Sequence, residues 1–152
     1  MKLLAGWCKL NVDAAFNART RSLGFSIIIR DSKGKVRVAK SMSKLGLVEL
    51  VAAETMVVFY GVSYCCDQGF QSLIVEGDAK QVVDTIQLRG RDASNFGQLV
   101  DDVLVIVDSF SNWQIQYVNR EVNSAAYVLA QVATKKVIDM VWIEVFKPSS
   151  SL

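Results

Sequence analysis

Three carboxylates are the side chains of this sequence best suited to chemistry. Asp13 lies in a segment of alternating apolar residues, Glu54 in a long alanine-rich segment, and Asp78 directly after a short apolar run. Hydrolysis of a phosphodiester by two metal ions needs several carboxylate oxygens converging on hard cations about 3.5–4 Å apart. Carboxylates suit Mg²⁺, and no softer ligand is required. Residues so far apart in sequence can form such a centre only if the fold brings their elements together.

The composition excludes several other kinds of catalysis. The chain contains no histidine, which rules out Ser-His-Asp hydrolysis, Cys-His proteolysis and imidazole metal sites. Its three cysteines include an adjacent pair and form no CxxC pattern, so we expect neither a zinc site nor a disulfide framework. The net charge of +2 is too small to indicate a nucleic-acid partner. Any catalysis therefore depends on carboxylates and bound metal ions.

Length and apolar content indicate one globular domain. The chain has 152 residues and is 51% hydrophobic, which is enough to bury a core and too apolar for a disordered chain. No apolar stretch is expected to reach the roughly 18 residues needed to span a bilayer, and the N-terminal segment is too short and too quickly polar for a secretory signal. We therefore expect an intracellular monomer without membrane contact.

Residue periodicity predicts the elements that carry the carboxylates. Alternating and isoleucine-rich segments indicate three consecutive antiparallel strands at 9–16, 24–30 and 35–41. The later segments are predicted at 49–66 (helix), 72–77 (strand), around 82–86 (helix), 98–109 (helix), 113–118 (strand) and 123–135 (helix). The order β-β-β-α-β-α-α-β-α predicts an α/β fold in which helices pack on a mixed sheet. Residues 137–152 show no clear element.

Each carboxylate also has a purely structural interpretation. Asp13, opposite the main apolar row of its strand, could face solvent on an edge strand, although aspartate is depleted in strands. Glu54 could pair with a lysine, but no lysine or arginine lies one turn away in its helix. Asp78, with Gln81 three residues later, has the spacing of an N-cap and capping box. The residues alone leave both interpretations open at all three positions.

Two residues near the last predicted helix also have structural interpretations. Asn123 stands where an N-cap is expected. Arg120 is adjacent to Glu121 and could form a surface ion pair with it.

Five local motifs together resemble a known family. They resemble the plant ribonuclease H-like domains of the type 1 ribonuclease H superfamily, which occur in, or derive from, non-LTR retroelement reverse transcriptases. The similarity covers about residues 7–135 and leaves 136–152 as a C-terminal tail. The motifs are Asn11-Val12-Asp13-Ala14-Ala15-Phe16, Ile29-Arg30-Asp31-Ser32-Lys33-Gly34, Ala53-Glu54, Val75-Glu76-Gly77-Asp78-Ala79 and Tyr117-Val118-Asn119-Arg120-Glu121-Val122-Asn123.

The resemblance implies a fold, a metal site and an activity. It implies a five-stranded mixed sheet on which Asp13, Glu54 and Asp78 converge as catalytic residues and ligands of Mg²⁺, or of Mn²⁺. The implied reaction is endonucleolytic hydrolysis of the RNA strand of an RNA/DNA hybrid, recognised by groove shape, phosphates and 2′-hydroxyls. We also predict that Arg120 and Asn123 contact nucleic acid.

Two positions depart from the family pattern. Active members usually carry a fourth aspartate in the last helix, where this chain has Tyr127, a poor ligand for Mg²⁺. Relatives often begin the last strand motif with His-Val, whereas this chain has Tyr117-Val118, and it has no histidine near the site to assist the reaction. Three hypotheses follow: a hydrolase of weakened activity, a catalytically impaired retroelement-derived module that binds nucleic acid, or a degenerate domain with neither function.

Overall fold

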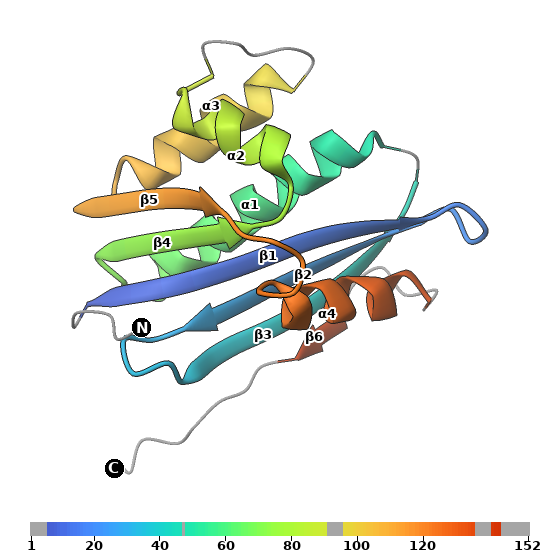
Figure 1. The fold of residues 1–152 in the computed structure, drawn as a ribbon, viewed down its shortest axis with the longest axis horizontal. Coiled ribbons are helices and arrows are strands. Elements are labelled where there is room, and N and C mark those ends of the chain that lie inside the picture. Colours follow the sequence, from blue (N-terminus) through green and yellow to red (C-terminus); the bar gives the residue numbers. More distant parts are fainter. Residues whose placement is uncertain (1–5, 47, 91–95, 136–140, 144–152) are drawn as a thin grey trace.

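A mixed β-sheet with helices on both faces forms the body of the molecule (Figure 1). The computed structural model describes residues 6–46, 48–90, 96–135 and 141–143. The elements are β1 (Trp7–Asn17), β2 (Ser22–Arg30), β3 (Val36–Leu45), α1 (Leu50–Asp67), β4 (Ser72–Gly77), α2 (Lys80–Gln87), α3 (Gly97–Val107), β5 (Asn112–Tyr117), α4 (Ser124–Thr134) and β6 (Val141–Ile143).

The sheet order is β5-β4-β1-β2-β3-β6. Strands β1, β2 and β3 are antiparallel to one another, whereas β4 is parallel to both β1 and β5. The predicted five-stranded mixed sheet and its order of elements are confirmed. The short strand β6 adds a sixth member by pairing with Ala39, Lys40 and Ser41 of β3. Part of the segment that showed no clear element thus extends the sheet.

Strand β1 is central, and its two faces have different partners. Leu10 and Val12 belong to the hydrophobic core. They pack so closely on α1 that a Cβ on Gly61 would lie 2.7 Å from a Leu10 methyl carbon. The alternate residues Asn11 and Asp13 are also buried, at 4% exposure each. Because side chains alternate along a strand, β1 contributes apolar groups to one face and polar groups to the other.

Helix α1 is a core helix with an unusually apolar composition. By length and composition alone its 18 residues could cross a membrane, with a mean hydropathy of 1.2. The expectation that no segment reaches this length and apolarity is therefore wrong for α1. Its contacts with β1, β2 and α3 explain the apolar residues, because the helix is packed between the sheet and another helix.

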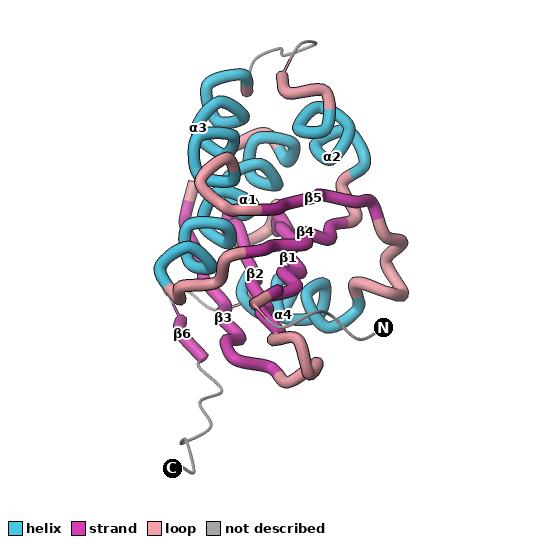
Figure 2. The backbone as a smooth tube through the Cα atoms, turned by 90° about the vertical axis from the view of Figure 1, so that its left-hand side faces the viewer, coloured by secondary structure: helices cyan, strands magenta, loops and turns pink. Residues whose placement is uncertain are grey.

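Helix α4 lies on the opposite face of the sheet from α1 (Figure 2). Buried serines of the sheet hold its carbonyl groups: Ser26 Oγ donates to the Ala126 oxygen and Ser22 Oγ to the Thr134 oxygen. Between them, a Cβ on Gly24 would overlap the Ala130 carbonyl oxygen. Small and hydroxylated strand residues therefore let α4 approach the sheet backbone closely.

We expect Gly24→Ala to destabilise the protein by about 1–3 kcal/mol, because the added methyl must displace α4 from the sheet. Chemical denaturation of both proteins measures the change. Gly77→Ala is the matched control, since a Cβ there would meet Val12 at an ordinary 3.6 Å. Equal stability of Gly24→Ala and the wild type would contradict the close seating of α4.

Candidate metal centre

The three carboxylates singled out by the sequence converge in the structure. One oxygen from each of Asp13, Glu54 and Asp78 lies within 4.8 Å of the others. Asp13 comes from the middle of β1, Glu54 from the first turns of α1, and Asp78 from the residue that follows β4. Asp13 and Glu54 are 4% and 9% exposed. The fold therefore builds one compact acidic centre from three elements.

The centre forms where two parallel strands separate. Strands β1 and β4 pair as far as Asn11 and Glu76, while β1 continues to Asn17 beside β2 alone. Beyond that point the edge of β1 next to β4 has no strand partner. The backbone N–H of Ala14 donates instead to the carboxylates of Asp13 and Glu54. The end of β4 thus makes room for the acidic side chains and leaves a backbone donor to hold them.

Burial and mutual repulsion favour protonated carboxyls in this centre. Burial, followed by the charge of Asp78 and a hydrogen bond with it, raises the pKa of Asp13 to about 7. Burial, followed by the charges of Asp13 and Asp78, raises the pKa of Glu54 to about 9. The Ala14 N–H and the Arg120 charge oppose these shifts without cancelling them. The protein alone does not supply enough positive charge to keep all three groups ionised near neutral pH.

Two oxygen atoms of the centre are buried without a hydrogen-bond partner. They are Oε1 of Glu54 and Oδ2 of Asp78. A buried acceptor without a partner is unfavourable, and most such atoms in proteins are satisfied. Hard carboxylate oxygens without a hydrogen-bond donor, in a cluster whose ligand oxygens lie within 4.8 Å of one another, suit a divalent cation such as Mg²⁺ or Mn²⁺. The donor set therefore fits the metal that the sequence predicted.

The structural interpretations of the three carboxylates are wrong. Asp13 lies on the central strand β1 rather than on an edge. Asp78 is no helix cap, because α2 begins at Lys80, its N-cap residue is Ala79, and no side chain caps it. The unpaired Oε1 of Glu54 excludes a lysine partner at that atom. Convergence at the centre is what these three positions have in common.

Arg120 and Tyr127 form one side of the centre. Arg120 Nε lies 3.7 Å from Asp78 Oδ2, and the guanidinium carbon lies 4.4 Å from the centroid of the Tyr127 ring. The charged partner of Arg120 is therefore Asp78, and the interpretation of an ion pair with the adjacent Glu121 is wrong. Tyr127, on α4, presents its ring to this cation at the position where relatives usually carry the fourth aspartate.

Asn123 connects α4 to the strand that carries Asp13. It occupies the N-cap position of α4, but its side chain makes no capping bond. Its Nδ2 instead donates to the Val12 carbonyl oxygen at 2.8 Å, and its Oδ1 accepts from Asn11 Nδ2 at 3.0 Å. The side chain is 1% exposed. Contact of Asn123 and Arg120 with nucleic acid stays a prediction.

A buried polar network beside the centre was missed by the sequence analysis. Asn11 Nδ2 also donates to Glu76 Oε1 at 3.0 Å. The second oxygen of Glu76 accepts from Gln116 Nε2 at 2.8 Å and lies 3.6 Å from Lys9 Nζ. The network joins β5, β4, β1 and the start of α4. A glutamate inside the apolar run of β4 was the available signal, because buried charges are rarely left without partners.

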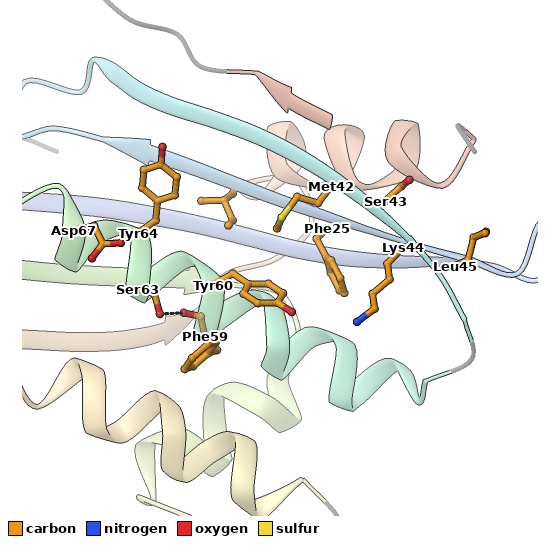
Figure 3. A pocket seen from close by; sticks show the side chains of 11 residues that line it. Phe25, Met42, Ser43, Lys44, Leu45, Phe59, Tyr60, Ser63, Tyr64 and Asp67 are labelled. Carbon is orange, nitrogen blue, oxygen red and sulfur yellow. Dashed lines mark hydrogen bonds between the residues drawn. The ribbon is translucent and has the colours of Figure 1, made fainter. Parts of the chain in front are cut away.

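An apolar cavity lies away from this centre. It has a volume of about 600 Å³ and lies between α1 and strands β2 and β3. Its walls include Phe25 and Met42 from the sheet and Phe59 and Tyr60 from α1 (Figure 3). None of the three carboxylates lines it. The cavity is apolar, and it contributes nothing to the metal centre.

We expect Glu54→Gln to stabilise the metal-free protein at pH 8. The folded pKa of Glu54 is about 9, against a usual value of 4.5. Folding therefore favours the protonated form, and the wild type loses stability as the pH rises through this range. Glutamine is neutral without taking up a proton on folding, so the substitution should increase stability by about 1 kcal/mol or more at pH 8, or roughly 2–4 °C in Tm. Thermal unfolding at pH 5 and pH 8 in a chelator measures it.

Glu121→Gln serves as the exposed control for the thermal measurement, because it removes the same charge outside the centre. The electrostatic description of the centre would be contradicted if Glu121→Gln raised the Tm at pH 8 as much as Glu54→Gln does. A Tm of Glu54→Gln below that of the wild type would contradict it as well.

Solved structures with the same fold belong to ribonucleases H. RNase H1 from Halobacterium salinarum has 18% identity and a TM-score of 0.76, covering 85% of this chain and 98% of that chain. The N-terminal RNase H domain of a Mycobacterium tuberculosis protein has 18% identity and a TM-score of 0.77, with coverages of 85% and 94%. An RNase H1 isolated from compost, in complex with an RNA/DNA hybrid, has 16% identity and a TM-score of 0.74, with coverages of 84% and 96%.

These identities are low, so the structures show that the fold is shared. No curated protein sequence matches the chain. A family model described as reverse transcriptase-like matches residues 11–133, a span that contains all three carboxylates. The resemblance to ribonuclease H-like domains is confirmed, whereas a plant origin stays a prediction. The chain belongs to the reverse transcriptase-like family and has the ribonuclease H-like fold.

Proposed function

We propose that the protein is a metal-dependent ribonuclease of the ribonuclease H type that cuts the RNA strand of RNA/DNA hybrids. The observation that carries the proposal is the convergence of Asp13, Glu54 and Asp78 within 4.8 Å, with a buried oxygen that accepts no hydrogen bond on two of them. The fold supports it, since one solved structure with this fold is an RNase H1 in complex with an RNA/DNA hybrid.

The same three side chains would hold Mg²⁺ or Mn²⁺. A divalent cation bound there would supply Lewis acidity and would lower the pKa of a water bound to it. Because their pKa values are raised to about 7 and 9, Asp13 and Glu54 must lose protons to act as ligands, so metal affinity should increase with pH. The hydrogen bond from the Ala14 backbone favours the ionised forms of both carboxyls, and Arg120 would bind a phosphate oxygen of the substrate.

We expect the protein to cleave a labelled RNA/DNA hybrid when Mg²⁺ or Mn²⁺ is present. Asp13→Asn should lower the rate at least about 100-fold, more than the 10–100-fold typical of losing a group that only supports a ligand. Gel analysis of the labelled RNA strand measures the rate. Asp101→Asn, on the exposed side of α3, is the matched control and should cleave at the wild-type rate. If the wild type cleaves the hybrid no faster than Asp13→Asn does, the catalytic proposal is refuted.

A module that binds nucleic acid without cleaving it is the second candidate. The observation that favours it is Tyr127, whose ring contacts Arg120 where a fourth carboxylate would otherwise stand. A neutral phenol contributes no charge to a metal centre at pH 7. The remaining charge pattern, with Arg120 next to the acidic groups, can still place a phosphate backbone beside the centre.

For this candidate we expect hybrid binding that weakens with salt, without hydrolysis. Arg120→Gln should weaken binding at low salt and reduce the slope of log K against log salt by about one, since one phosphate contact is lost. Fluorescence anisotropy in a chelator measures both. Arg89→Gln is the matched control, because Arg89 pairs with Asp108 instead. The absence of binding at low salt would exclude the module.

A further inference from the structure

We propose that the carboxylate centre binds one divalent cation. The positive charge of Arg120 takes the place of a second ion. The inference rests on the proposed function only in requiring that Asp13, Glu54 and Asp78 bind a metal ion. It concerns how many ions the centre holds and which residue limits that number.

The charges of the centre favour a single ion. Three ionised carboxylates carry three negative charges, and Arg120, whose Nε lies 3.7 Å from Asp78, carries one positive charge. One divalent cation then makes the group neutral. A second would leave two uncompensated positive charges in a partly buried site, where like charges repel strongly.

Two contacts from different elements place Arg120 in the role of a fixed cation. Its Nε faces Asp78 after β4, and its guanidinium carbon lies 4.4 Å from the Tyr127 ring on α4. The face of an aromatic ring attracts a cation, so Tyr127 holds a positive charge where an aspartate would attract a metal. Tyr127 thus supplies no carboxylate ligand for a metal ion. Its ring also helps to keep the positive charge of Arg120, which competes with a second ion, beside the centre.

Neighbouring carboxylates are committed to other partners. Glu76 accepts hydrogen bonds from Asn11 and Gln116, and Asp84 pairs with Lys80 at 3.0 Å. In the part of the chain that the structure describes, the acidic cluster able to hold an ion contains Asp13, Glu54 and Asp78 only. No fourth carboxylate is therefore available there for a second ion.

Arg120 keeps hydrogen-bond donors for a phosphate. At 3.7 Å its contact with Asp78 is longer than a hydrogen bond, and its side chain is 67% exposed. A guanidinium has five N–H donors in a planar fork that matches phosphate oxygens. Arg120 can therefore contact a backbone phosphate beside the single ion while it remains over Tyr127.

Calorimetric titration of the metal-free protein with Mn²⁺ at low salt counts the ions directly. We expect one ion for the wild type. Arg120→Gln should still take one ion but bind it about tenfold more tightly, because a repelling charge has been removed. Arg89→Gln removes the same charge from an exposed pair with Asp108 and should leave the affinity unchanged.

A double variant tests the limit on the number of ions. Arg120→Gln combined with Tyr127→Asp supplies a fourth carboxylate and removes the competing charge, so we expect two Mn²⁺ ions per chain. Tyr127→Asp alone should still take one ion, because Arg120 would pair with the new carboxylate. Both positions lie at the surface or half-buried, and circular dichroism checks that each variant is folded.

Two ions on the wild type, or equal affinities of the wild type and Arg120→Gln, would overturn the inference. Its failure is distinguishable from failure of the proposed function. If the wild type binds two ions and cleaves the hybrid, the proposed ribonuclease function is supported and the single-ion centre is refuted. One ion that Arg120→Gln binds more tightly, without cleavage by the wild type, would support the single-ion centre and refute the ribonuclease. No Mn²⁺ binding would refute both.

Discussion

The parallel pairing of β1 with β4 ends at Asn11 and Glu76, and the candidate site depends on that end point. Up to there, backbone groups satisfy one another and the side chains fill a core. Beyond it, β1 has an open edge within the molecule, and its polar groups need other partners. Asn123 donates a hydrogen bond to the Val12 carbonyl, and the Ala14 backbone hydrogen-bonds to the carboxylates of Asp13 and Glu54. A strand that stops early therefore creates both the space and the local polarity of the centre.

This arrangement opposes stability locally. Carboxylates that share one buried site repel one another and lose hydration, and two of their oxygens have no hydrogen-bond partner. The surrounding structure keeps them there: Gly61 lets α1 pack directly against Leu10, and Gly24 lets α4 approach the other face of the sheet. Sites that are poised for a ligand commonly reduce the stability of the protein without it. The tight seating of two helices compensates for a strained centre.

The secondary-structure elements and the carboxylates of the site were predictable from local sequence patterns. The contacts of two neighbouring polar residues were not. Periodicity located the elements, because alternation and helical spacing are properties of neighbouring residues. Glu54 was identifiable because burying a carboxylate in an apolar helix segment is unfavourable unless the group has a partner or a function. The partners of Arg120 and Asn123 were not predictable, since nearby Glu121 and an N-cap role were equally compatible with the sequence. Their actual contacts, with Asp78 and with β1, connect segments that meet only after the sheet has formed.

The strand β6 affects how the molecule meets other copies of itself. Without it, β3 would end the sheet with a row of unpaired backbone groups, which is a template for edge-to-edge association. Among the residues that the structure describes, β6 covers Ala39, Lys40 and Ser41 of that edge. The exposed charged residues Arg37 and Lys44 stand on either side of that covered stretch, and like charges on an edge discourage pairing with a second chain. A short added strand and flanking positive charge thus disfavour strand pairing with a second chain along the β3 edge of the sheet.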